Sequence, residues 1–227
     1  MSITHIIKNL SENNWNNQKN DYSQLQSKNP RINLVTNPAE LRANDIVDWG
    51  NCGKEFDFLP TPLSVKSTNG LSLKLSSLGT FLRLTEGSGI KGNFTSGDEL
   101  LFLEFADSAI TIDFATPIFG IGTQIQRAFF GAFTGIIEAF DRSGKSLGKF
   151  SVSGKSNSST PFIGVVSETA NISRITLYVP ENGGYGFTIN GLSIVTQLEQ
   201  PTLPSNLFLF NKNRSVSTTF NIFQYNN

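Results

Sequence analysis

The alternation of apolar and polar residues between Ala109 and Gly164 constrains the fold of this chain more than any other feature. In AITIDF, Ile110, Ile112 and Phe114 alternate with polar residues, which is the period of a strand with one solvent-facing side. The run FTGIIEAF is followed by DRSG and then by SLGKFSVSG. This pattern predicts a hairpin, because Asp can hydrogen-bond its own backbone and Gly supplies a positive φ.

Further strand-like runs follow one another at intervals of about 8 to 12 residues, with no long helical pattern between them. They are LSLKL, TFLRLTE, ELLFLEF, PFIGVVS, RITLYV and YGFTINGLSIV. A chain of 227 residues with 38% hydrophobic residues is long enough to bury a sizeable core in one domain. We therefore expect an all-β fold, an antiparallel β-sandwich or jelly roll.

The domain organisation that we predict has three parts. Residues 1–35 are rich in Asn, Gln, Ser and Lys and form a polar N-terminal arm that cannot bury its own core. Residues 36–200 form the sandwich domain, which opens with one short helix. Its start is indicated by Asn37 as cap and Pro38 in the first turn. Residues 201–227 are a C-terminal tail or an edge strand.

Composition excludes several classes of function. Lys+Arg and Asp+Glu both number 18, so no basic excess supports nucleic acid binding. Cys52 is the only cysteine and His5 the only histidine, so neither an internal disulfide nor a Cys/His zinc site can form. No run of about 18 apolar residues predicts a membrane span. The N-terminus lacks the basic and apolar regions of a secretory signal.

Several blocks in this order resemble a β-sandwich domain of cyanobacterial exported proteins that often carry a PEP-CTERM sorting tail. They are NDIVDWGNCG, GNFTSGDELLF, ITIDFATPIFGIGTQIQ, FGAFTGIIEAFDRSGKSLGKFSVSG, PFIGVVS, NISRITL and FTINGLSIVT, over residues 44–196. The resemblance implies a galactose-binding-like or jelly-roll sandwich in the extracellular matrix or at the cell surface, acting on exopolysaccharide, with no catalytic motif. The chain departs from the pattern because it shows no leader and no sorting tail after Pro204. Its localisation therefore stays open.

No constellation of residues predicts catalysis. A His-based triad is excluded because His5 lies in the polar arm, and Cys52 has only Lys54 as a local cation, which favours a buried, inert thiol. A glycosidase needs two carboxylates at a fixed separation, and the spacing selects no pair. Asp113 and Glu138 interrupt apolar alternation and are expected on solvated strand faces. The other carboxylates considered are Glu99, Glu104, Asp107 and Asp141, the last of which we place in the hairpin turn.

The loop NDIVDWGN is the richest candidate site in the sequence. Asp45, Asp48 and Asn51 offer oxygen ligands of the kind that calcium takes, so a structural calcium ion is the only cofactor that we consider. Turn and helix capping is the alternative role for the same side chains. Trp49, beside Asp48 and Asn51, could stack against a sugar ring while the polar groups bind its hydroxyls.

Two further segments combine aromatic and polar residues in the same way. Tyr185 lies near Asn182 in ENGGYG, and Arg127 precedes Phe129 and Phe130 in QRAFFG. Packing in the core or in a loop is the alternative for each, because large aromatic side chains are mostly buried.

The leading hypothesis is a non-catalytic extracellular or surface sandwich that binds carbohydrate, either exopolysaccharide or an envelope glycan. The first alternative is a structural, self-assembling protein whose arms add a strand to a neighbouring copy. The second is a polysaccharide-active hydrolase. The expected partners are thus carbohydrate or further copies of the chain, in an oligomer of unknown size, with neither nucleic acid nor a membrane span involved.

Overall fold

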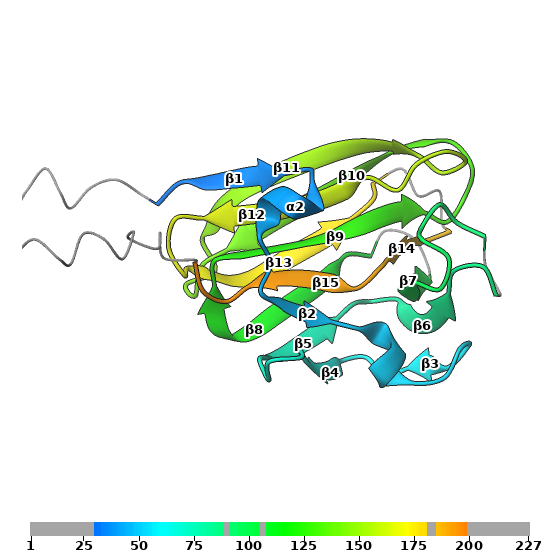
Figure 1. Cartoon of the computed structure of the whole chain (residues 1–227), viewed down its shortest axis with the longest axis horizontal. Coiled ribbons are helices and arrows are strands. Elements are labelled where there is room, and N and C mark those ends of the chain that lie inside the picture. The colour runs from blue at the N-terminus through cyan, green and yellow to red at the C-terminus, as the bar shows by residue number, and fades with distance from the viewer. Residues whose placement is uncertain (1–29, 89–90, 105–107, 181–184, 199–227) are drawn as a thin grey trace, which may run out of the picture. The chain divides into compact units, whose positions relative to one another are not determined.

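Two antiparallel sheets make up the fold (Figure 1). The computed structural model describes residues 30–88, 91–104, 108–180 and 185–198, and every structural statement below concerns these residues. Each strand pairing is antiparallel. The all-β antiparallel sandwich predicted from the strand spacing is confirmed.

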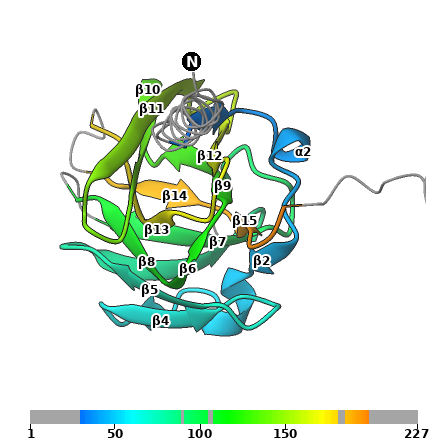
Figure 2. The ribbon, with the colours of Figure 1, turned by 90° about the vertical axis from the view of Figure 1, so that its left-hand side faces the viewer.

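The first sheet has six strands, which Figure 2 shows running from β11 near the top to β4 at the bottom. In order across the sheet they are β11 (Ser146–Lys155), β10 (Ala132–Phe140), β13 (Ile172–Tyr178), β8 (Ile110–Ile118), β5 (Ser72–Ser76) and β4 (Leu63–Lys66).

The second sheet has nine strands. Its main path is β1 (Ile32–Val35), β12 (Phe162–Ser167), β9 (Gly120–Arg127), β14 (Phe187–Ile189), β7 (Glu99–Glu104), β6 (Thr80–Thr85) and β3 (Phe58–Leu59). A side branch is formed by β15 (Leu192–Val195), which pairs with β9 and with β2 (Asp45–Val47).

The core lies between the inward faces of the two sheets. Ile110, Ile112 and Phe114 are buried as their alternation predicts, and Ile121 and Ile125 of β9 belong to the same apolar cluster from the opposite sheet. Burial of apolar surface at about 25 cal/mol per Å² is the main favourable contribution to such a fold. One face of each strand is thereby committed to the core, which leaves the loops and the outward faces for function.

The predicted short helix is confirmed as α2 (Pro38–Leu41). The side chain of Asn37 caps it by accepting a hydrogen bond from the amide of Ala39 at 3.1 Å. Leu41 packs with Phe162 in a small cluster that is separate from the main core. The second helix is a 3₁₀ turn, η1 (Trp49–Cys52). Neither is long or apolar enough to cross a lipid bilayer.

The hairpin between β10 and β11 also forms as predicted. Asp141 accepts hydrogen bonds from the amides of Ser143 and Lys145, and Gly144 adopts a φ of 83°. The sheet begins earlier than we predicted, since residues 32–35 form β1 instead of the end of the arm. Residues 1–29 of the predicted arm and the whole predicted tail, 201–227, lie outside the described residues, so those domain assignments stay predictions.

Candidate functional site

The opening loop does not present its tryptophan to a ligand. Trp49 has 0% exposure, and its indole Nε1 donates a hydrogen bond to the carbonyl oxygen of Asn190 at 2.8 Å. The loop folds inward here because η1 packs against β7 and β6. Trp49 is therefore a core residue, which corrects the prediction that it stacks against a sugar ring.

The candidate calcium ligands in this loop hold its backbone. The buried carboxylate of Asp45 accepts hydrogen bonds from Ser67 Oγ and from the amides of Ile46 and Asn69, the latter two at 2.9 Å. Asp48 caps η1 by accepting from the amide of Gly50, also at 2.9 Å. These are the capping roles that the sequence left as the alternative.

Asn51 is exposed and lines a hollow together with Asp48. Asp45, by contrast, is 4% exposed. In the described ranges, no group of three or more His, Cys, Asp or Glu side chains is placed to hold a metal ion. The structural calcium ion remains a prediction, with Asp48 and Asn51 as the accessible ligands.

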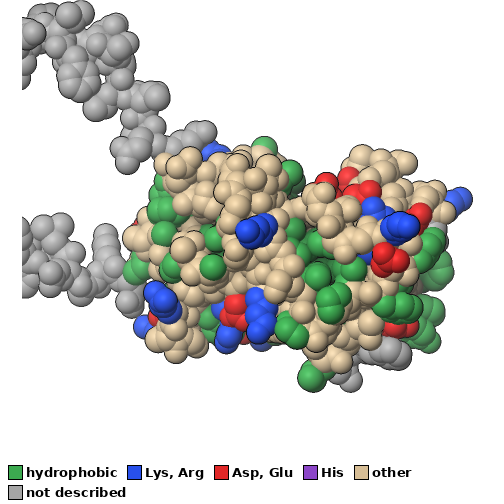
Figure 3. All heavy atoms as spheres, turned by 90° about the horizontal axis from the view of Figure 1, so that it is seen from below, with side chains coloured by type: hydrophobic (Ala, Val, Ile, Leu, Met, Phe, Trp, Pro, Cys, Tyr) green, Lys and Arg blue, Asp and Glu red, His purple; other side chains and the backbone are tan. Residues whose placement is uncertain are grey.

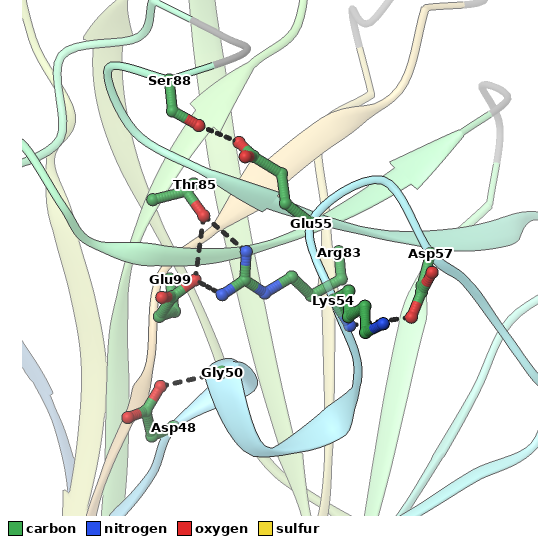
Figure 4. A network of polar contacts seen from close by, with 9 residues as sticks. All are labelled: Asp48, Gly50, Lys54, Glu55, Asp57, Arg83, Thr85, Ser88 and Glu99. Carbon is green, nitrogen blue, oxygen red and sulfur yellow. Dashed lines mark hydrogen bonds and ion pairs between the residues drawn. The ribbon is translucent and has the colours of Figure 1, made fainter.

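An ion pair between a buried arginine and a half-buried glutamate lies next to this loop (Figure 4). The guanidinium of Arg83 contacts the carboxylate of Glu99, and Thr85 Oγ1 donates to the same carboxylate at 3.1 Å. Because removing Glu99 would leave the buried charge of Arg83 uncompensated, Glu99 has a structural role here. Burial and the negative charge of Asp48 raise the pKa of the Cys52 thiol, and Arg83 opposes them only in part. A raised pKa fits the inert thiol that we expected.

Two of the other carboxylates considered for hydrolysis lie on outward strand faces. Asp113 accepts from Arg174 Nε at 2.6 Å, and Glu138 accepts from Ser146 Oγ at 2.7 Å. Both stand at outward-facing positions of half-buried strands, as their sequence pattern predicts. Glu104 ends β7, and Asp107 lies outside the described residues.

Three exposed aromatic side chains gather instead at one end of the sandwich. The rings of Phe129 and Tyr185 are stacked, with centroids 4.5 Å apart and planes inclined by 14°. Phe130 is tilted by 57° to Phe129, with 6.1 Å between centroids. These three residues are the aromatic platform. The guanidinium carbon of Arg127 lies 6.0 Å from the centroid of the Phe129 ring.

The aromatic platform is unusually exposed. Phe129 retains 45% of its accessible surface, Tyr185 54% and Phe130 74%. Large aromatic side chains bury most of their surface in a typical domain, so an exposed cluster of them indicates a binding surface.

Two strands of the larger sheet position the platform. Arg127 ends β9 and stands opposite Phe187, the first residue of β14, and the amide of Ala128 donates to the carbonyl oxygen of Gly186 at 3.1 Å. Gly186 has a φ of 78°, and a Cβ there would collide with the carbonyl oxygen of Leu103. A glycine is thus required beside Tyr185, and the 128–131 loop is held against it.

The sequence named the members of the platform but not their proximity. The sequence pattern pairs Tyr185 with Asn182, which lies outside the described residues, and makes Arg127, Phe129 and Phe130 a separate candidate. They meet because β14 inserts between β9 and β7, a strand order that no local pattern indicates.

No protein family model and no curated protein matches this chain. Solved structures with a similar fold include a DUF4465 family protein from Bacteroides caccae, at 13% identity and a TM-score of 0.44 over 73% of this chain and 100% of that one. A family 11 carbohydrate-binding module from Clostridium thermocellum, in complex with a β-1,3-1,4-mixed-linked tetrasaccharide, has 13% identity and a TM-score of 0.30 over 65% and 96%. CsCBM6-3 from Clostridium stercorarium, in complex with cellobiose, has 13% identity and a TM-score of 0.25 over 67% and 93%. Likeness at this level does not transfer a ligand or a site.

Proposed function

We propose that this chain is a non-catalytic carbohydrate-binding domain and that the aromatic platform is its sugar-binding surface. The observation that carries the proposal is the stacked pair of Phe129 and Tyr185, which keeps about half of each ring in solvent with Phe130 beside it. Leaving so much apolar surface in water forgoes the stabilisation that burial would give.

The chemistry of the platform suits a sugar. The apolar C–H face of a pyranose packs on an aromatic ring, and hydroxyl groups at its rim need hydrogen-bond partners. The Tyr185 hydroxyl and the Arg127 guanidinium can supply these beside the rings. The resemblance of residues 44–196 to exported cyanobacterial domains supports an extracellular or cell-surface role on exopolysaccharide.

Affinity electrophoresis tests this function directly. The intact chain is run in native gels that contain a neutral soluble polysaccharide, in turn a β-glucan, a xylan and a galactomannan. We expect at least one to retard the chain, and Tyr185→Ala or Phe130→Ala to lower the apparent affinity by about fivefold or more, since an aromatic contact of this kind contributes about 1 kcal/mol or more.

The matched control is Phe58→Ala, because Phe58 is 67% exposed on the edge strand β3 and lies outside the platform. It should leave retardation unchanged. Equal losses for Phe58→Ala and Tyr185→Ala, or no retardation by any of the neutral polysaccharides, would contradict the proposal.

A further inference from the structure

The outward face of the six-stranded sheet carries a straight row of five residues, four of them polar, that the proposed function does not use. Each of five neighbouring strands contributes one residue to the row, and each of these residues is the cross-strand partner of the one on the next strand. From β4 to β10 they are Ser64, Lys74, Asp113, Arg174 and Phe140. Strands spaced about 4.8 Å apart make this row about 19 Å long.

A groove of about 530 Å³ occupies the β4 end of the row. Lys66 and Lys74 line it with exposed side chains, together with the hydroxyls of Ser64 and Ser72 and the carboxylate of Asp113, and the rest of its lining is apolar. Its walls are strands of the sheet, so the groove is part of the rigid fold.

This face has a net positive charge, although the formal net charge of the whole chain is zero. Arg174 Nε donates to Asp113 at 2.6 Å, so Arg174 offsets the only carboxylate in the groove. Within the described part of the chain, Lys66 and Lys74 form no ion pair. Figure 3 shows basic groups on either side of an acidic one, surrounded by uncharged surface.

A second row runs beside the first and is rich in hydroxyls. Ser76, Thr111 and Thr176 stand opposite one another, and the row continues to Glu138 and Lys149. Glu138 faces Lys149 across the strands, which leaves the charge at that end balanced. Of these two rows, therefore, only the first, which runs into the groove, carries an excess of positive charge.

We propose that this groove is a second binding site and that it takes the carboxylate groups of an acidic polysaccharide. Two unpaired lysines match the negative charge of successive uronate units, and the neighbouring serine and threonine hydroxyls match their hydroxyl groups. The length and openness of the row fit an extended chain better than a single small anion. The site is separate from the aromatic platform and does not depend on it.

Affinity electrophoresis with polygalacturonate tests the second site. The double variant Lys66→Ala/Lys74→Ala should bind polygalacturonate about tenfold more weakly than the intact chain, because each exposed ion pair contributes up to about fivefold. Lys91→Ala/Lys155→Ala, which removes the same charge from exposed positions elsewhere, should bind as the intact chain does.

The variant Asp113→Asn should bind polygalacturonate more tightly than the intact chain, which is the opposite of the effect expected for the lysine variants. It removes the only negative charge in the groove, so affinity for polygalacturonate should rise by about twofold to fivefold. Binding should also weaken as sodium chloride is raised, because exposed charges are screened. If the lysines had only a structural role, Asp113→Asn would not tighten binding of polygalacturonate, and sodium chloride would not weaken it.

Three outcomes would overturn the inference. The first is equal weakening by the two double-lysine variants. The second is loss of polygalacturonate binding in Tyr185→Ala, which would place the acidic polymer on the aromatic platform. The third is equally tight binding of a single-stranded RNA of the same charge, which would show attraction to any polyanion. Failure of neutral polysaccharide binding alone would instead contradict the proposed function and leave this site unaffected.

Discussion

At the scale of single residues, burial separates the two aromatic candidates that the sequence left equal. Trp49 lies in the loop with the most polar side chains, yet it is enclosed and bonded to Asn190. Tyr185 lies between glycines and is open to solvent on a stacked partner. Residue type and neighbours along the chain could not distinguish them, because enclosure depends on contacts more than a hundred residues away.

Trp49 should therefore govern stability and not binding. Trp49→Ala should lower the free energy of unfolding by about 3 to 5 kcal/mol, through the cavity that the indole leaves, and Trp49→Phe by less. Urea denaturation followed by circular dichroism measures this. Phe58→Ala is the exposed control and should stay within about 0.5 kcal/mol of the parent chain.

A Trp49→Phe variant that unfolds at the same urea concentration as the parent chain but has lost polysaccharide binding would contradict a purely structural role for Trp49. That pattern would return Trp49 to the binding surface.

At the scale of elements, the hairpin of β10 and β11 gives a prediction of pH dependence. The hydrogen bond from the Ser143 side chain, helped by two amides and the charge of Lys145, lowers the pKa of Asp141 below its ordinary value of 3.8. A lowered folded pKa gives stability that is present above the unfolded pKa and is lost as pH falls through the folded value.

The measurement is the difference in melting temperature between the parent chain and Asp141→Asn. The side chain at position 141 cannot ionise in the variant. The parent chain should therefore have the higher melting temperature from neutral pH to about pH 4. Below that pH the difference in melting temperature should shrink, because the carboxylate of Asp141 takes up its proton. A difference that is constant between pH 3 and pH 7 would show that the charge of Asp141 does not stabilise the turn.

Local patterns predicted most of the elements. Alternation in the β8 stretch, DRSG at the hairpin and the Asn37 cap each act through nearest neighbours, so the sequence alone contains the signal. The pairing of β8 with β5 and β13, and hence the row that contains Asp113, depends on strand order. Strand order is set by packing of the whole core, so the groove on that face had no sequence signal beyond the polar positions of each strand.

At the scale of the whole molecule, the sandwich separates two kinds of surface. The aromatic platform stands at the end of β9 and β14 in one sheet, and the lysine-lined groove stands on β4, β5 and β8 of the other. Neutral sugar rings and acidic sugar chains would then bind at different places on one rigid domain. The two surfaces share no residue, so each can be altered without changing the other.

The measurement that tests the central claim most directly is NMR of the intact chain with ¹³C-labelled tyrosine rings. The chain has four tyrosines, of which Tyr185 lies in the platform and Tyr178 on the outward face of the six-stranded sheet, with Lys149 Nζ 5.4 Å from its ring centroid. Tyr→Phe variants assign the signals, and the titrant is the neutral polysaccharide that retards the chain most. Saturable shifts of the Tyr185 signal, with Tyr178 unmoved, are the predicted result. Binding that shifts Tyr178 and leaves Tyr185 unmoved would contradict it.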